Sequence, residues 1–267
     1  MTRGLLLDLD GTVFVGDALI PGALKALEAI RSFGLPILFA TNMTRQPRRV
    51  LLEKLAAMGL PLVAEDVYTA PIAGCAWLEE QGFRRVLSCF APATLEDLPG
   101  FEFVDPRDAT AAPPFGKPVD AVLIGDLGNQ WSYSILNAAF RHVMAGAALV
   151  AIQRNLYWRD TDGLSLDAGP FIVALESAAS VQATVVGKPS RAFFRGAAAL
   201  LGFPLSEIAM VGDDITSDVG GAQEAGATGV LVQTGKFREG DLAGPVRPDA
   251  VLDSIASLPA WIRSRLT

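Results

Sequence analysis

The 267-residue chain is 51% hydrophobic and 19% charged, with a formal net charge of −7. This length and composition predict one large domain or two modest ones and exclude intrinsic disorder. The acidic balance argues against a nucleic-acid-binding surface, which needs clustered lysine and arginine. Because His142 is the only histidine, a multi-histidine metal site is also excluded.

Hydrophobic stretches long enough to cross a bilayer are not found in the sequence. The apolar run at residues 4–7 is too short for a signal peptide and ends at Asp8. The two cysteines, Cys75 and Cys89, cannot form a disulfide framework. We therefore expect a soluble, cytoplasmic protein with no membrane or nucleic-acid partner.

Short apolar runs alternate with amphipathic stretches in the first and last thirds of the chain, which is typical of a parallel sheet covered by helices. In the first third we expect strands at 5–9, 35–40 and 67–69 and helices at 21–34 and 47–58. In the last third we expect strands at 184–186, 208–211 and 229–232 and helices at 191–201, 217–225 and 255–265. The fold class is therefore α/β, with a Rossmann-like parallel-sheet core.

The middle of the chain is less regular. Residues 90–118 are rich in proline and predict a loop. A strand at 121–124, a helix around 135–143 and a strand at 149–152 follow. We interpret 73–180 as an inserted α/β domain and 1–72 with 181–267 as the core.

Four groups of polar residues follow predicted core strands. The first is Asp8-Leu9-Asp10-Gly11-Thr12, in which alternation places Asp8 and Asp10 on one side of an extended segment. Two such close carboxylates repel unless a cation lies between them. An acidic turn at the end of a strand would explain the same residues without a function.

The second and third groups supply a hydroxyl, an amide and an amine. Thr41 and Asn42 follow the strand at 35–40, where they would bind phosphoryl oxygens or simply cap a helix. Lys188 follows the strand at 184–186 and would neutralise a phosphoryl group or a carboxylate. A solvated surface lysine is an equally good interpretation of this residue taken alone.

The fourth group is Gly212-Asp213-Asp214, with Asp218 nearby. Three acids after a buried strand suit Mg²⁺, which prefers oxygen ligands. Asp218 would also suit the first turn of the next helix. Because ligand sites of open α/β sheets lie at the carboxyl ends of strands, the four groups together predict a site for phosphoryl transfer.

The four groups, in their order along the chain, resemble the motifs of the haloacid dehalogenase (HAD) superfamily. They are Asp8-x-Asp10-Gly11-Thr12, Thr41-Asn42, Lys188-Pro189 and Gly212-Asp213-Asp214. The resemblance implies a Mg²⁺-dependent phosphatase in which Asp8 is the nucleophile, Asp10 is the general acid and base, and Lys188 is also catalytic. It implies phosphate binding by Gly11, Thr41, Asn42 and Lys188. The implied metal ligands are Asp8, Asp213 and the main-chain carbonyl of Asp10, with Asp214 and Asp218 behind them.

The insertion between Thr41 and Lys188 resembles the type C2 cap of subfamily IIA. Within that branch, the segments 185–189, 212–223 and 234–237 are most similar to phospholysine phosphohistidine inorganic pyrophosphate phosphatases and their hydrolase-like paralogues. This similarity alone implies a small phosphorylated metabolite, pyrophosphate or a phosphoamino acid as substrate. Caps of this type often take part in dimerisation, so a homodimer is a further expectation.

The cap is expected to select the substrate through an irregular segment at 155–169. Its polar and aromatic members are Asn155, Tyr157, Trp158 and Asp167. A surface hairpin without a role in specificity is the alternative. For the whole chain, a phosphoryl-accepting or catalytically silent binding protein remains the alternative to an enzyme.

Overall fold

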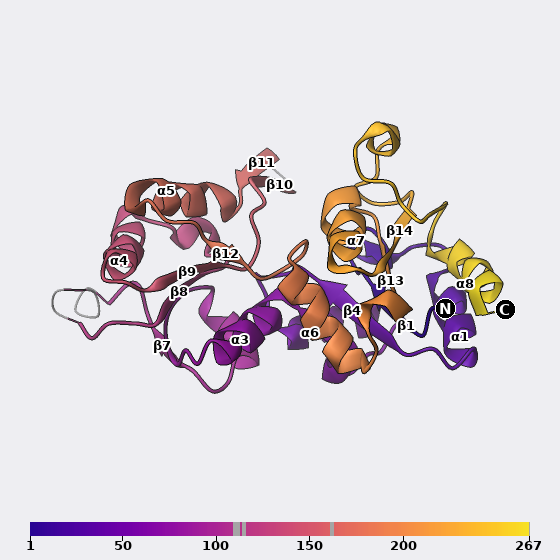
Figure 1. The fold of residues 1–267 in the computed structure, drawn as a ribbon, viewed down its shortest axis with the longest axis horizontal. Helices are drawn as coiled ribbons and strands as arrows, with labels where there is room; N and C mark the ends of the chain where they lie inside the picture. Colours follow the sequence, from indigo (N-terminus) through magenta and orange to yellow (C-terminus); the bar gives the residue numbers. More distant parts are fainter. Residues whose placement is uncertain (109–112, 114–115, 161–162, 267) are drawn as a thin grey trace. The chain divides into compact units, whose positions relative to one another are not determined.

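The structure, a computed structural model, describes residues 1–108, 113, 116–160 and 163–266 (Figure 1). The chain divides into two compact units. Unit 1 comprises Met1–Thr41, Arg49–Tyr68 and Lys188–Thr267, and unit 2 comprises Asn42–Arg48 and Thr69–Gly187. None of the helices in the described residues is both long and apolar enough to cross a membrane.

Unit 1 is organised around a six-stranded sheet with the order β15-β14-β13-β1-β4-β5. The pairs of β1 with β13 and β4, and of β14 with β13 and β15, are parallel. The strands are β1 (Gly4–Leu7), β4 (Ile37–Thr41), β5 (Val67–Thr69), β13 (Ile208–Gly212), β14 (Thr228–Val232) and β15 (Ala250–Leu252). A hairpin of β2 (Phe14–Val15) and β3 (Ala18–Leu19) follows β1.

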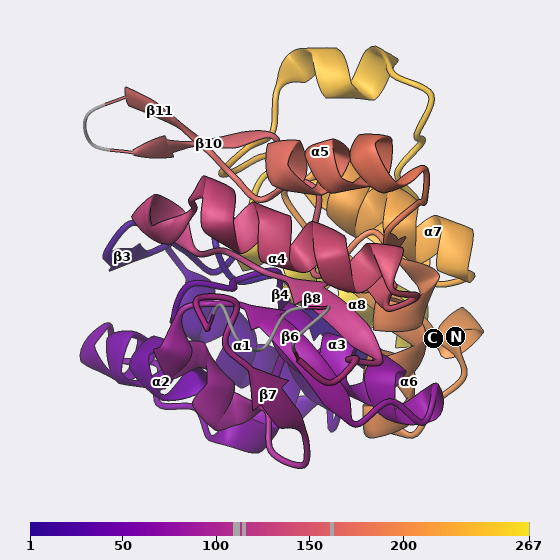
Figure 2. The same cartoon turned by 90° about the vertical axis from the view of Figure 1, so that its left-hand side faces the viewer.

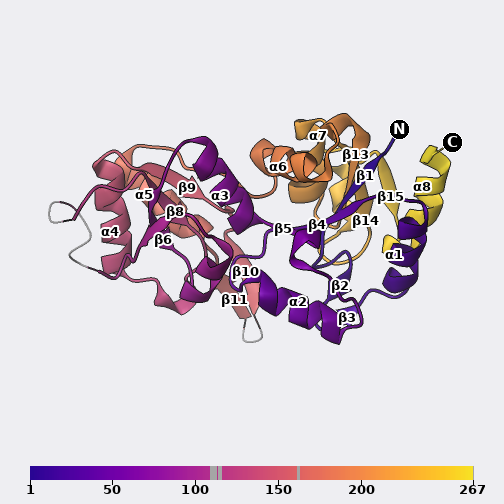
Figure 3. The same ribbon diagram turned by 90° about the horizontal axis from the view of Figure 1, so that it is seen from below.

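Helices cover both faces of this sheet, with α1 and α8 on one side and α6 and α7 on the other (Figures 1 and 3). The unit's helices are α1 (Ala23–Ser32), α2 (Arg48–Ala57), α6 (Arg191–Leu201), α7 (Gly221–Ala225) and α8 (Leu258–Leu266), with short 3₁₀ turns at Ala64–Asp66, Leu205–Glu207, Glu239–Ala243 and Ile255–Ser257. Leu5, Leu6 and Leu7 are fully buried, which explains why β1 is apolar without alternation.

Unit 2 contains a second parallel sheet, with the order β12-β9-β8-β6-β7. Its strands are β6 (Arg85–Cys89), β7 (Glu102–Val104), β8 (Ala121–Ile124), β9 (Ala148–Ala151) and β12 (Thr184–Val185). Its helices are α3 (Ala70–Glu80), α4 (Tyr133–Met144) and α5 (Gly169–Ala179), with 3₁₀ turns at Pro92–Asp97 and Gly128–Gln130. A separate hairpin pairs β10 (Tyr157–Asp160) with β11 (Gly163–Leu166).

The helices of unit 2 pack on opposite faces of its sheet. Figure 2 shows α4 and α5 side by side, and their core includes Leu87, Val122 and Ile124. Helix α3 lies on the other face, where a Cβ atom on Gly74 would lie 2.8 Å from Ile152 Cδ1 and 3.8 Å from Leu123 Cδ1. The expected α/β fold with a parallel-sheet core is therefore confirmed.

Three expectations for secondary structure are corrected. The proline-rich stretch 90–118 contains strand β7, and the segment expected to be irregular at 155–169 contains the β10–β11 hairpin. Residues 109–112, 114–115 and 161–162 of these stretches lie outside the described residues. Instead of one helix at 217–225, the structure has a π-helix η5 (Ile215–Gly220) followed by α7.

Candidate active site

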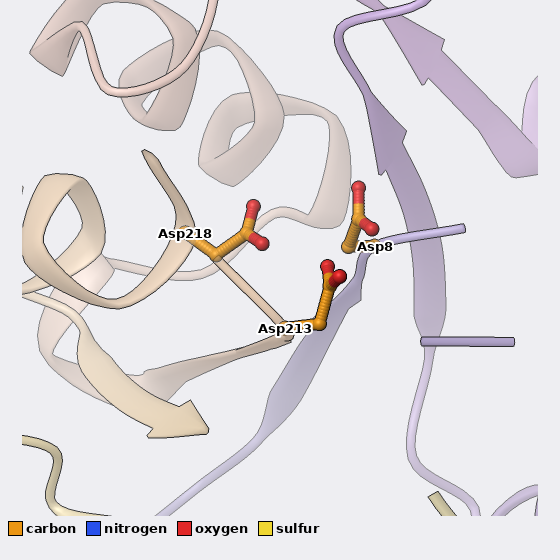
Figure 4. A group of neighbouring side chains, drawn as sticks. All are labelled: Asp8, Asp213 and Asp218. Carbon is orange, nitrogen blue, oxygen red and sulfur yellow. The ribbon is translucent and has the colours of Figure 1, made fainter. Parts of the chain in front are cut away.

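Three buried carboxylates meet at the carboxyl edge of the unit 1 sheet. Asp8 directly follows β1, and Asp213 directly follows the neighbouring strand β13. Asp218 comes from η5, and one oxygen of each carboxylate lies within 4.8 Å of the others. Figure 4 shows the three side chains pointing toward one another. Parallel strands that end at one edge thus bring together acids that are far apart in the sequence.

Lys188 joins two of these acids. Its Nζ donates hydrogen bonds to Asp8 Oδ1 at 2.6 Å, to Asp218 Oδ1 at 2.7 Å and to the carbonyl oxygen of Ala40 at 3.0 Å. Burial alone would lower the pKa of this amine, but the negative charges of Asp218 and Asp8 raise it above its ordinary value. Lys188 is therefore a buried, charged group that holds Asp8 in a fixed position.

The buried acids outnumber the buried base. Asp8, Asp213 and Asp218 carry three negative charges when ionised, and Lys188 carries one positive charge, which leaves a formal charge of −2. Burial, followed by the charge of Asp8, raises the pKa of Asp213 to about 7, and burial raises that of Asp218 to about 6. A divalent cation with a preference for oxygen ligands fits both the donor atoms and the charge of this group.

Glycines make room for the carboxylates. A Cβ atom on Gly11 would lie 2.0 Å from Asp213 Oδ2, and one on Gly235 would lie 2.1 Å from the same oxygen. A Cβ on Gly212 would lie 2.2 Å from Asp218 Oδ2. Gly11 also has a φ of 91°, which side chains rarely adopt. These glycines are needed because the acids pack directly against the backbone.

The segment after β14 completes the surroundings of Asp213 and was not among the predicted site residues. The backbone N–H of Lys236 donates to Asp213 Oδ2 at 2.6 Å, and Thr234 Oγ1 donates to the carbonyl oxygen of Gly11 at 2.6 Å. The signal in the sequence was the Thr234-Gly235-Lys236-Phe237 segment, which resembles the family but carries no acid. Main-chain donors of this kind leave little trace in the sequence.

Asp214 and Asp218 have different surroundings. The Asp214 carboxylate accepts hydrogen bonds from the backbone N–H groups of Thr216 and Ser217 at 3.0 and 2.9 Å, so it caps η5. Asp218 instead lies in the acid cluster and also accepts from the backbone N–H of Asp214 at 3.2 Å. Of these two acids, Asp218 thus belongs to the acid cluster and Asp214 does not, and a contact of either with a metal stays a prediction.

Asp10 is exposed and its carboxylate is not part of the acid cluster. Its backbone forms a bridge with Phe14, and the neighbouring Gly11 N–H donates to the Phe14 carbonyl oxygen at 2.7 Å. Partial desolvation and the charge of Asp8 raise the pKa of Asp10. Its proposed contact with a metal through the main-chain carbonyl stays a prediction.

The two predicted phosphate ligands at the end of β4 belong to different units. Thr41 is the last residue of β4 and is buried in unit 1. Asn42 is the first residue of the next segment of unit 2, where Gly187 approaches its side-chain oxygen closely. Their binding of phosphate stays a prediction.

The residues expected to select the substrate all lie in unit 2, near the β10–β11 hairpin. Asn155 and Tyr157 are exposed, whereas Asp167 is buried and accepts a hydrogen bond from Gln153 Nε2 at 2.6 Å. Trp158 is in β10, and its side chain lies outside the described part of the structure. A role of these residues in specificity stays a prediction.

Comparisons with known proteins identify the family of the chain. Residues 5–103 match the family model of haloacid dehalogenase-like hydrolases, and residues 185–258 match a HAD-hydrolase-like model. The human haloacid dehalogenase-like hydrolase domain-containing protein 2 is 38% identical over 239 residues, which cover 90% of this chain and 87% of the relative. The human phospholysine phosphohistidine inorganic pyrophosphate phosphatase is 34% identical over 261 residues, which cover 95% of this chain and 92% of the relative.

Solved structures extend the agreement to the fold. The 4-nitrophenylphosphatase of Thermotoga maritima superposes with a TM-score of 0.85 at 25% identity, and the match covers 97% of both chains. Two family models, close relatives over nearly the whole chain and a phosphatase of the same fold thus agree. The chain belongs to the haloacid dehalogenase-like hydrolase family and is a phosphatase of that family.

Proposed function

We propose that this protein is a Mg²⁺-dependent phosphatase that hydrolyses a small phosphorylated metabolite, pyrophosphate or a phosphoamino acid through an aspartyl-phosphate intermediate. The observation that carries the proposal is the position of Lys188 Nζ, 2.6 Å from Asp8 Oδ1 and 2.7 Å from Asp218 Oδ1. A lysine held in this way orients the Asp8 carboxylate and offsets the negative charge that accumulates when a phosphoryl group approaches.

In the proposed first step, an oxygen of Asp8 attacks phosphorus. A bond forms between Asp8 and phosphorus, the bond to the leaving oxygen breaks, and the Asp10 carboxyl donates a proton to that oxygen. In the second step, water attacks the phosphoryl group while the Asp10 carboxylate takes a proton from it. The bond between phosphorus and Asp8 then breaks and releases inorganic phosphate. Thr41, Asn42 and the backbone at Gly11 are proposed to bind the phosphoryl oxygens.

Asp8 and Asp213 would hold Mg²⁺, together with the main-chain carbonyl of Asp10 and with Asp218 close by. The formal charge of −2, which the group carries when all three acids are ionised, supports a divalent cation there. When bound, the cation would supply Lewis-acid stabilisation of the phosphoryl oxygens. Divalent metals are general in phosphatases of this family.

Unit 2 is proposed to act as the cap that selects the substrate, in line with the expected division into 1–72 with 181–267 and 73–180. The human relative named as a phospholysine phosphohistidine inorganic pyrophosphate phosphatase supports phosphoamino acids and pyrophosphate as substrates. The named 4-nitrophenylphosphatase supports 4-nitrophenyl phosphate as a test compound. A cytoplasmic location and dimerisation stay predictions.

The test is phosphate release from a panel of 4-nitrophenyl phosphate, pyrophosphate, phosphohistidine, phospholysine, pyridoxal phosphate, sugar phosphates and nucleotides. We expect release with Mg²⁺, at least 100-fold less after chelation, and none above background for Asp8→Asn. Asp17→Asn is the matched control, since its carboxylate is 95% exposed and lies in the β2–β3 turn. Turnover by Asp8→Asn at the rate of the unchanged protein would contradict an Asp8 nucleophile.

The nucleophile can also be identified directly. After acid quenching during turnover of ³²P-labelled substrate, we expect label on the peptide that contains Asp8 and none in Asp8→Asn. Label on another residue would contradict the proposed intermediate. Mg²⁺ binding without release from any substrate of the panel would contradict the proposed substrate class.

A further inference from the structure

The boundary between the two units falls inside the predicted phosphate-binding segment. Thr41, the last residue of β4, belongs to unit 1, and the next residue, Asn42, begins a segment of unit 2 that ends at Arg48. The chain then returns to unit 1 at Arg49. The position of Asn42 therefore depends on the contacts that attach the segment 42–48 to unit 2.

Two hydrogen bonds to the backbone attach this segment. The buried Thr94 donates through Oγ1 to the carbonyl oxygen of Thr44 at 3.3 Å. At the end of the segment, the backbone N–H of Arg48 donates to Asp97 Oδ2 at 2.6 Å. Thr94 and Asp97 belong to the same 3₁₀ turn, which follows β6. The middle and the end of the segment are thus fixed to one turn of unit 2.

An ion pair is the third attachment. Arg45 Nε donates to Asp126 Oδ2, and Asp126 lies in the loop that follows β8. Asp126 is only 6% exposed, and its other oxygen, Oδ1, accepts from the backbone N–H of Gly128 at 2.7 Å. A carboxylate that is buried this deeply is costly without a cation beside it. Because the backbone holds Asp126 in place, this acid also determines where Arg45 lies.

The first residue of the segment lies against the end of unit 2. A Cβ atom on Gly187 would lie 2.9 Å from Asn42 Oδ1, so the Gly187 backbone approaches the Asn42 side chain closely. The N–H of Gly187 donates to the carbonyl oxygen of Ile152 at 2.8 Å, directly after β9. In unit 1, by contrast, Lys188 Nζ donates to the carbonyl oxygen of Ala40 at 3.0 Å. The proposed phosphate ligands are therefore held by two different units.

We propose that Arg45 is a positioning residue for phosphoryl transfer. Through its ion pair with Asp126 it holds the segment 42–48 on unit 2, and it thereby sets the position of Asn42, which binds the phosphoryl group. The proposal rests on the proposed phosphatase function and adds a coupling to it. Because unit 2 is also the proposed cap, the unit that selects the substrate carries one of the phosphate ligands.

A second acid near Arg45 gives the alternative role. Burial raises the pKa of Asp167, and among the weaker influences the charge of Arg45 lowers it. Asp167 is one of the residues proposed to select the substrate. A role of Arg45 in selection would change the ratio between substrates, whereas a positioning role lowers the turnover of all substrates by the same factor, because all of them carry the phosphoryl group.

The test is a double-mutant cycle, measured as kcat/KM with 4-nitrophenyl phosphate and with pyrophosphate. We expect Asn42→Ala to lower kcat/KM about 100-fold, as for the loss of one oxyanion donor, and Arg45→Met to lower it about tenfold, because the donor is displaced. The double variant should be no worse than Asn42→Ala, since Arg45 acts through Asn42. Additive losses, or unequal losses for the two substrates in Arg45→Met, would overturn the proposal.

Further variants separate positioning from folding. Asp126→Asn leaves no unpaired buried carboxylate and still accepts from Gly128, so it should keep its thermal midpoint and show the same loss as Arg45→Met. Arg45→Lys keeps the charge and should restore activity to within about threefold. Arg107→Met, which breaks the pair with Asp105 in the same unit, is the control and should stay within about twofold. Full activity of Asp126→Asn would overturn the role of the ion pair.

Hydrogen exchange supplies a readout that does not need activity. We expect the backbone N–H of Arg48 to exchange about tenfold faster in Arg45→Met, whereas the N–H groups of β1 should not change. Unchanged exchange at Arg48 in an active protein would overturn the attachment by Arg45 and leave the phosphatase function intact. Inactivity of the unchanged protein on every substrate would instead contradict the phosphatase function, and with it the role of Asn42.

Discussion

The carboxyl edges of the two parallel sheets differ in the side chains that they carry. In unit 1, the edge holds three buried carboxylates and a buried lysine. In unit 2, the edge at β6 and β7 holds a pocket lined mainly by apolar side chains, and its charged groups, Asp105 and Arg107, pair with each other. The two sheets share one architecture, and the residues after each strand decide the chemistry of its carboxyl edge.

The largest effect on activity is expected when Asp10, the proposed general acid and base at the charged edge of unit 1, is replaced. Asp10→Asn should lower turnover about 10³-fold, the range of general acid–base catalysis, because the amide cannot exchange the proton. Affinity for Mg²⁺ should stay within about twofold, since only the main chain of Asp10 would contact the metal. Steady-state kinetics and calorimetry check the two parts. A collapse of metal affinity would assign the Asp10 carboxylate to the metal instead.

Removing the buried cation tests the balance of charge at the same edge. Lys188→Met would leave three buried acids without their partner, so we expect about 100-fold lower activity and a loss of about 3 kcal/mol in the free energy of unfolding. Lys236→Met is the matched control, because its side chain is 65% exposed and its ion pair with Asp214 spans 3.4 Å. Urea unfolding should detect less than about 1 kcal/mol for it. Equal losses would contradict the structural role of Lys188.

A smaller effect is expected from crowding the acids without changing any charge. In Gly11→Ala the new Cβ would displace Asp213, so activity should fall about tenfold or more and stability by about 2 to 3 kcal/mol. Gly16→Ala is the control, since its φ of 59° is also positive but no atom lies within 4 Å of the new Cβ. It should lose only about 1 kcal/mol and keep its activity. Similar kinetics for both variants would show that displacement of Asp213 does not affect catalysis.

The smallest effect concerns the opposite, amino end of the unit 2 sheet. The backbone N–H groups of Arg84 and Arg85 donate to Asp120 Oδ2 at 2.8 and 2.9 Å and lower the pKa of this exposed carboxyl. A lowered pKa stabilises the fold above the ordinary pKa of the group and loses this effect as the pH falls through the folded-state pKa. Asp120→Asn should therefore lower the free energy of unfolding by about 0.5 kcal/mol at pH 7. Below the folded-state pKa of Asp120, the substitution should have no measurable effect on stability. A constant difference across this range, measured by urea unfolding, would contradict an electrostatic origin.

Elements with a clear periodicity were predictable from the sequence. Helix α6 has the expected bounds, Arg191–Leu201, because its apolar residues recur on one face and Ser190 caps it. Helix α5, at Gly169–Ala179, was not predicted, because its sequence is apolar on nearly all sides and begins with Gly-Pro. Strand β7 was not predicted either, because it has only three residues between two prolines. Its stability comes from pairing with β6 and not from local strand propensity.

In the candidate site, too, some features were predictable from the sequence and others were not. Asp8, Lys188 and Asp213 were found because acids and an amine after buried strands carry an obvious chemistry. The contacts of Gly235 and of the Lys236 N–H with Asp213 were not found, because backbone groups and missing side chains give no chemical signal. The pocket at the carboxyl ends of β6 and β7 was also missed, since the fold brings its residues together from separate segments.

The interrupted course of unit 1 along the chain has a consequence for synthesis on the ribosome. Strand β1 lies between β4 and β13 in the sheet, but β13 begins only at Ile208. All strands of unit 2 have been made once Val185 has emerged, so its sheet is complete in sequence while β1 still lacks one neighbour. During translation, the backbone edge of β1 that pairs with β13 therefore stays unpaired until after every strand of unit 2 has been made.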